Sequence, residues 1–176
     1  MTRRFTRRAL VRIAGLPARV MMLLCLLSGA AVADQFLPLG GGWQTYINDR
    51  FGMRFDYPAD LFTPAAPPEN GDGRSFEAPE AALYMFASHN TAGDTPASFK
   101  RQLIGSENYE HVTYSPSGES WLVISGFRGR QIFYEKYFFN DGVISAFGME
   151  FPADKKPHYA PMVERIEDSF RAGRSD

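Results

Sequence analysis

The sequence predicts an α+β fold in which helices cover one antiparallel sheet. Residues 34–176 contain repeated short segments rich in aromatic and β-branched residues, separated by Gly, Pro, Asn and Asp. Three long segments of this kind follow one another in the second half of the chain, which predicts an antiparallel meander. The last segment instead repeats its apolar residues at helical spacing. Helices layered on a sheet bury the apolar surface of both elements.

Residues 1–33 read as a secretion signal that precedes this domain. The basic segment Thr2–Arg8 is followed by the apolar run Val20–Leu27 and then by the small residues Ala31–Ala33. We therefore predict cleavage before Asp34, one globular domain over residues 34–176, and a periplasmic or secreted location. An uncleaved membrane anchor is the alternative, although a spanning helix needs roughly 20 apolar residues. Thr6–Val11 also resembles a twin-arginine export signal.

Removal of the signal changes the charge and the cysteine content. Six of the 19 basic residues and none of the 20 acidic residues lie in residues 1–33, so residues 34–176 carry a formal charge of 13 − 20 = −7. Nucleic-acid binding depends on clustered Lys and Arg, so nucleic acid is not an expected partner. The single cysteine, Cys25, also lies in the signal. The mature protein therefore has no disulfide, thiolate nucleophile or cysteine-bound metal.

The first half of the domain predicts strands and one helix. A hairpin is expected from Trp43–Asn48 and the alternating Met53–Tyr57. The proline-rich stretch Leu61–Pro68 suits neither regular structure. Further strands are expected at Arg74–Ala78 and Ala81–Ala87. Thr95 and Pro96 then predict the start of a helix that ends before Gly105.

The second half predicts four strands and a closing helix. The strands are expected at His111–Tyr114, Ser120–Phe127, Gln131–Phe139 and Val143–Phe151, with turns at Gly118, Gly129 and Gly142. The helix is expected from Pro157 to Arg171, because its apolar residues share one face: Met162, Val163, Ile166 and Phe170.

This order of elements resembles the PsbP-like superfamily, whose fold is shared with a Ran-binding nuclear import factor. The resemblance rests on Tyr46–Pro58, on the central meander, and on a terminal helix that ends in Ser169-Phe170. It implies an α/β/α sandwich that serves as a non-enzymatic accessory or binding module. The chain also resembles small uncharacterised exported proteins of Gram-negative bacteria. No binding residue of the superfamily matches a position of this sequence.

The domain contains no recognisable catalytic motif. It has no Gly-x-Ser-x-Gly elbow, zinc-binding His-Glu-x-x-His or phosphate-binding loop. His89, His111 and His158 share no metal-ligand spacing. Glu69–Gly73 resembles part of a calcium loop, but prolines stand where the first and last ligands would be, which favours a plain turn. We expect no metal and no cofactor.

Aromatic residues are dense in the three central strands. Tyr137, Phe138 and Phe139 are consecutive, so they point to opposite faces of the sheet. Either helices cover both faces, or an apolar patch is exposed for a partner. The candidate interaction surface combines aromatic residues with neighbouring arginines: Trp121, Phe127, Arg128, Arg130, Tyr134 and Tyr137.

Two functions fit these observations. The first is a periplasmic binding or assembly module, without catalytic activity, that recognises an unknown protein or small ligand through the sheet and its loops. The second is an envelope-acting hydrolase. Its acid and base would be carboxylates that folding brings into one cleft, from among Asp56, Asp60, Glu77 and Glu135.

Overall fold

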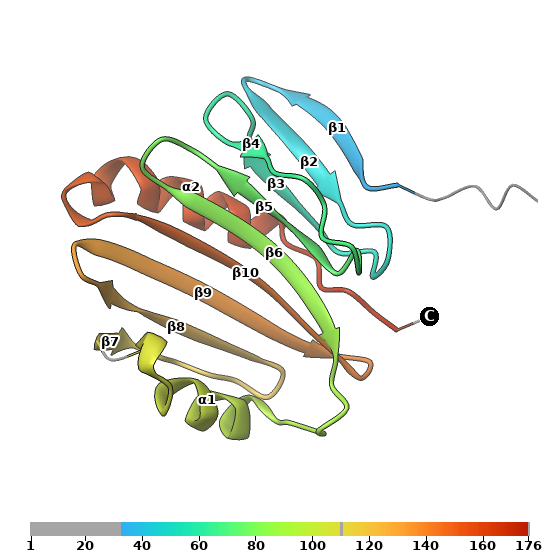
Figure 1. Ribbon diagram of the computed structural model, residues 1–176, viewed down its shortest axis with the longest axis vertical. Helices are drawn as coiled ribbons and strands as arrows, with labels where there is room; N and C mark the ends of the chain where they lie inside the picture. Colours follow the sequence, from blue (N-terminus) through green and yellow to red (C-terminus); the bar gives the residue numbers. More distant parts are fainter. Residues whose placement is uncertain (1–32, 110, 176) are drawn as a thin grey trace, which may run out of the picture. The chain divides into compact units, whose positions relative to one another are not determined.

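The computed structural model describes residues 33–109 and 111–175, so the predicted signal lies outside the described residues except for Ala33. The larger sheet has seven antiparallel strands in the order β4-β5-β6-β10-β9-β8-β7 (Figure 1). Their bounds are Thr63–Pro64 (β4), Gly73–Glu77 (β5), Ala82–His89 (β6), His111–Tyr114 (β7), Trp121–Arg128 (β8), Gln131–Asn140 (β9) and Val143–Pro152 (β10). The predicted meander is confirmed as β8, β9 and β10.

A second sheet holds the predicted N-terminal hairpin. Its strands are β1 (Gln35–Gly40), β2 (Trp43–Ile47) and β3 (Arg54–Pro58), paired in that order. Strand β1 was not predicted because it lacks an alternating pattern: it contains Pro38, and both of its leucines are almost half exposed. The stretch Leu61–Pro68, expected to be irregular, contributes the two-residue strand β4, which pairs with the end of β5. In both segments, hydrogen bonding to an adjacent strand thus outweighs a low local preference for strand structure.

Both predicted helices are present. Helix α1 spans Pro96–Ile104, and its start is fixed by a reciprocal cap in which the amide of Ser98 donates to the Thr95 hydroxyl and the amide of Thr95 donates to the Ser98 hydroxyl. Helix α2 spans Lys156–Ser169. It ends two residues before the predicted Arg171 because Phe170 adopts extended backbone angles. Among the described residues, neither helix combines the length and the apolar character needed to cross a membrane.

The two helices cover opposite faces of the larger sheet. On one face, Phe138 of β9 stacks on Phe170 just after α2, with ring centroids 4.8 Å apart. On the other face, Tyr137 packs edge-on against Phe99 of α1 at 5.3 Å. Neighbouring strand residues point to opposite faces, so the consecutive aromatic residues belong to two separate cores. The α/β/α arrangement expected from the resemblance is therefore observed.

Coverage by α2 is uneven across its face of the sheet. The helix packs against β3 of the small sheet and against β9 and β10 of the large one. Its buried residues are Tyr159, Val163 and Ile166, which join the core beneath the small sheet. The α2 face of β7 and β8 lies beside the helix, and a concave surface remains there.

Candidate functional site

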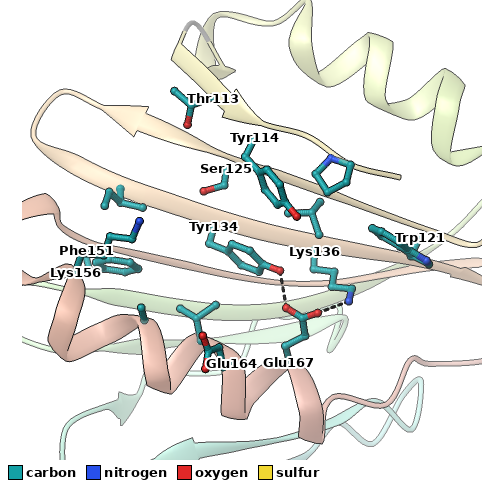
Figure 2. A pocket seen from close by; sticks show the side chains of 15 residues that line it. Thr113, Tyr114, Trp121, Ser125, Tyr134, Lys136, Phe151, Lys156, Glu164 and Glu167 are labelled. Carbon is teal, nitrogen blue, oxygen red and sulfur yellow. Dashed lines mark hydrogen bonds and ion pairs between the residues drawn. The ribbon is translucent and has the colours of Figure 1, made fainter. Parts of the chain in front are cut away.

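The concave surface beside α2 forms a groove, which we call the α2 groove. It has a volume of about 580 Å³ and lies between α2 and strands β7, β8 and β9 (Figure 2). One wall is formed by Lys156, Ala160, Val163, Glu164 and Glu167 of α2. The rest of its lining comes mainly from the sheet: Thr113, Tyr114, Pro116, Trp121, Val123, Ser125, Ile132, Tyr134, Lys136 and Phe151.

Local sequence periods bring these side chains to one place. On β8, Trp121, Val123 and Ser125 alternate with residues of the opposite core, so they all reach the groove. On β9, Tyr134 and Lys136 do the same. On α2, the lining residues follow Lys156 at offsets of four, seven, eight and eleven, which place them on one side of a helix.

The centre of the groove is a hydrogen-bonded network around Glu167. Its carboxylate accepts a hydrogen bond from the Tyr134 hydroxyl at 2.5 Å and forms an ion pair with Lys136 (Figure 2). The Lys136 ammonium also lies 5.2 Å from the ring centroids of Trp121 and Phe138. Burial and the hydrogen bond to Glu167 raise the pKa of Tyr134 well above its usual value. The central polar groups at the floor of the groove therefore satisfy one another.

The six residues of the candidate interaction surface are divided among three places. Trp121 and Tyr134 line the α2 groove. The side chains of Arg128 and Tyr137 instead lie on the face of the sheet that α1 covers, where Tyr137 is buried. Phe127, which is 40% exposed, and Arg130 lie at the exposed end of the β8–β9 hairpin. The six do not form one continuous surface.

A different polar cluster is enclosed on the α1 face. The buried Glu135 carboxylate accepts hydrogen bonds from the hydroxyls of Tyr109 and Tyr137 and pairs with Arg128 at 2.8 Å. Arg128 also pairs with Glu150 at 3.1 Å and lies 4.2 Å from the ring centroid of Phe133. Burial, followed by the charge of Glu135, raises the pKa of Tyr109 to about 12. Every oxygen of this carboxylate has a partner, which suits a structural role.

The other acids considered from sequence lie on separate elements. Asp56 accepts a hydrogen bond from Thr45 within the small sheet at 2.7 Å, Asp60 is exposed in the turn that follows β3, and Glu77 is exposed at the end of β5. None of them, and not Glu135, lines the α2 groove.

The sequence-based candidates for metal binding are also apart. The segment Glu69–Gly73 begins in a turn, in which the amide of Gly71 donates to the carbonyl of Pro68 at 3.0 Å, and ends at the first residue of β5. Within residues 33–109 and 111–175, no three His, Cys, Asp or Glu side chains lie close enough together to hold a metal ion. The three histidines lie on β6, β7 and α2.

Sequence reasoning missed the α2 wall of the groove. Lys156 precedes the predicted helix Pro157–Arg171, Glu164 and Glu167 lie within it without a predicted role, and Tyr114 belongs to a predicted short strand. The missing signal was a second pattern on α2, in which Ala160 and Val163 stand between charged residues. That pattern becomes informative only when the helix is known to stop short of β8.

No protein-family model and no curated protein sequence matches this chain. Among solved structures, it is similar to cyanobacterial PsbP from Synechocystis sp. PCC 6803, with 12% identity over 85% of this chain and 98% of that chain and a TM-score of 0.57. It is also similar to the Ran-binding protein Mog1p from Saccharomyces cerevisiae, with 7% identity over 80% of this chain and 96% of that chain and a TM-score of 0.47. The strand order, the two helices and the similarity to cyanobacterial PsbP together show that this chain has the α+β PsbP-like fold.

Proposed function

We propose that this protein is a binding module without catalytic activity, that it acts in the periplasm, and that the α2 groove is its recognition site. The observation that supports this proposal most directly is that the central polar groups of the groove already have hydrogen-bond or ion-pair partners within the protein. Tyr134, Lys136 and Glu167 are bonded to one another, and the Ser125 hydroxyl donates to the carbonyl of Phe133 at 2.8 Å. Apart from Thr113, the remaining lining outside α2 is aromatic or aliphatic, as is common in ligand and partner sites.

Catalysis would need a different arrangement. A general acid or base must be able to exchange a proton with a reacting atom, and a hydroxyl nucleophile needs a base within hydrogen-bond reach. The groove is lined by two glutamates and by no histidine or cysteine. Glu167 is held by Tyr134 and Lys136, and the Ser125 hydroxyl donates to a carbonyl, so Glu164 is not hydrogen-bonded to either hydroxyl as a base would be to its nucleophile. These features favour binding over the hydrolase hypothesis.

The proposed location rests on residues 1–33, with their basic start, apolar run and small residues before Asp34. It is tested by fractionating cells that express the full chain and measuring the mass of the exported protein. A periplasmic protein that begins at Asp34 is expected. A full-length chain that stays in the membrane fraction would contradict the proposed location.

The recognition site is tested by filling the groove. In Ala160→Trp, a large ring on the α2 wall would occupy the space between the helix and Tyr134. Wild-type protein crosslinked in periplasmic extract is expected to give a defined adduct that Ala160→Trp loses. The matched control is Ala97→Trp, which places the same ring on the exposed side of α1. Equal adducts from all three proteins would show that recognition lies elsewhere.

A further inference from the structure

The charges along the α2 wall are arranged around an apolar middle. Lys156 and Glu164 line the groove at positions eight residues apart, and Ala160 and Val163 lie between them. A rise of 1.5 Å per residue separates the two charged positions by about 12 Å along the helix axis. The wall therefore presents a positive end, a short apolar stretch and a negative end.

Lys156 and Glu164 differ from the other charged residues of the groove because they are free to pair with a ligand. Lys156 and Glu164 are exposed, and neither forms an ion pair with a charged side chain of the described residues. In contrast, Glu167 one turn further along is already engaged by Lys136 and Tyr134. A ligand that enters the groove would meet one cation and one anion that lack partners.

The surface opposite the helix has an apolar part beside the polar centre formed by Tyr134 and Lys136. Tyr114 is 58% exposed at the edge of the groove, and Val123, Ile132 and Phe151 line its floor. A saccharide or a nucleotide would bring many hydroxyl or phosphate groups into contact with this floor and leave them without partners, which costs free energy. An apolar side chain between two opposite charges matches the groove better.

We propose that the occupant of the α2 groove is a segment of a partner protein with an acidic residue, an apolar or aromatic anchor, and a basic residue, in that spatial order from Lys156 to Glu164. This inference rests on the proposed function of the groove. A span of about 12 Å corresponds to roughly four residues of an extended segment or eight residues of a helix. The acidic and basic residues of the partner are therefore expected at one of these two separations.

The inference is tested with a random library of 12-residue displayed peptides selected on the exported protein. Peptides enriched by wild type are expected to carry one acid and one base on either side of an aromatic or aliphatic residue. The double variant Lys156→Glu/Glu164→Lys is expected to select the opposite order of charges. It should bind the wild-type peptides about tenfold more weakly, and exchanging the two charges in those peptides should restore binding.

Two controls separate this inference from the proposed function. Lys156→Glu places an acid at the start of α2, where it is favourable, so the double variant is expected to fold, as circular dichroism would verify. If Ala160→Trp abolishes binding but charge reversal leaves the selected order unchanged, the charge pattern is wrong and the groove remains the site. If Ala160→Trp leaves peptide binding unchanged, the peptides bind elsewhere. Selection of no peptide, or a dimer that Ala160→Trp dissociates, would overturn the proposed occupant.

Discussion

The two faces of the larger sheet accommodate charged side chains in different ways. On the α1 face, the charged group Glu135 is buried and enclosed by two tyrosines and Arg128. On the α2 face, Lys136, the next residue of the same strand, pairs with Glu167 at the floor of an open groove. Adjacent residues of one strand thus belong to an enclosed cluster on one face and to the proposed recognition groove on the other. The comparison teaches that charge within a sheet is informative only together with what covers it.

The largest expected loss of stability comes from a substitution of Glu135, and it distinguishes this residue from its neighbour Lys136. Glu135→Gln keeps the volume of the side chain but removes its negative charge. That charge pairs with Arg128 and strengthens the hydrogen bonds that the carboxylate accepts from Tyr109 and Tyr137. Loss of one member of a buried pair typically costs about 3–5 kcal/mol, and we expect about 3 because Arg128 is partly exposed. Urea unfolding measures the change. Glu150→Gln removes the more exposed partner of the same arginine and is expected to cost less than about 1 kcal/mol.

A loss below about 1 kcal/mol for Glu135→Gln would contradict the description of the α1 face as a closed structural core. It would place Glu135 instead among groups that the protein can leave without a partner. The Glu135 cluster would then be a candidate ligand site, like the α2 groove.

The helix contacts allow a second comparison of the faces. Phe170 is 5% exposed and stacks on Phe138, so Phe170→Ala is expected to destabilise the protein by about 3 kcal/mol through the cavity it leaves. Phe99 on α1 is only partly buried, and Phe99→Ala is expected to cost about half as much. Thermal unfolding of the two variants tests the order. A larger loss for Phe99→Ala would mean that α1 is the principal structural helix.

Alkaline pH tests the enclosed cluster in another way. An unfolded tyrosine releases its proton near pH 10, whereas Tyr109 in the folded protein keeps its proton up to a pKa of about 12. Between these values the unfolded state binds fewer protons, so the free energy of unfolding falls as the pH rises. We expect Tyr109 to contribute up to about 2 kcal/mol of this loss by pH 11.5, where the folded hydroxyl is still mostly protonated. Urea unfolding between pH 9 and pH 11.5 should give a shallower decline for Tyr109→Phe; an unchanged decline would contradict the raised pKa.

Much of the architecture could be predicted from local patterns in the sequence. The alternation in Met53–Tyr57 and the stripe formed by Met162, Val163, Ile166 and Phe170 predict a strand and a helix because both patterns depend on burial of one side. Strand β1 could not be predicted, since its leucines are exposed and it is defined by pairing with β2. The division of the large and small sheets likewise depends on contacts between distant residues.

The candidate groove was less accessible to sequence reasoning than the fold. Trp121 and Tyr134 were singled out by their aromatic character, and both line the groove. Arg128 and Tyr137 were grouped with them because they are close in sequence, but a strand sends adjacent residues to opposite faces. Lys156 and Glu164 join the groove only because α2 crosses the face beside β9, and no local pattern encodes where a helix lies on a sheet.

The smallest expected effect concerns Lys136, and it decides whether the floor of the groove is maintained for stability or for recognition. Lys136→Met keeps most of the apolar stem against Trp121 but removes the ion pair with Glu167. Because such a pair near solvent is worth little, urea unfolding should change by less than about 0.5 kcal/mol, and the difference should shrink further in 0.5 M salt. The freed Glu167 would nevertheless present a new negative charge beside Tyr134, so peptides selected on wild type should bind several-fold differently. A stability loss above about 2 kcal/mol without any change in binding would assign this pair to the same structural role as Glu135 on the opposite face.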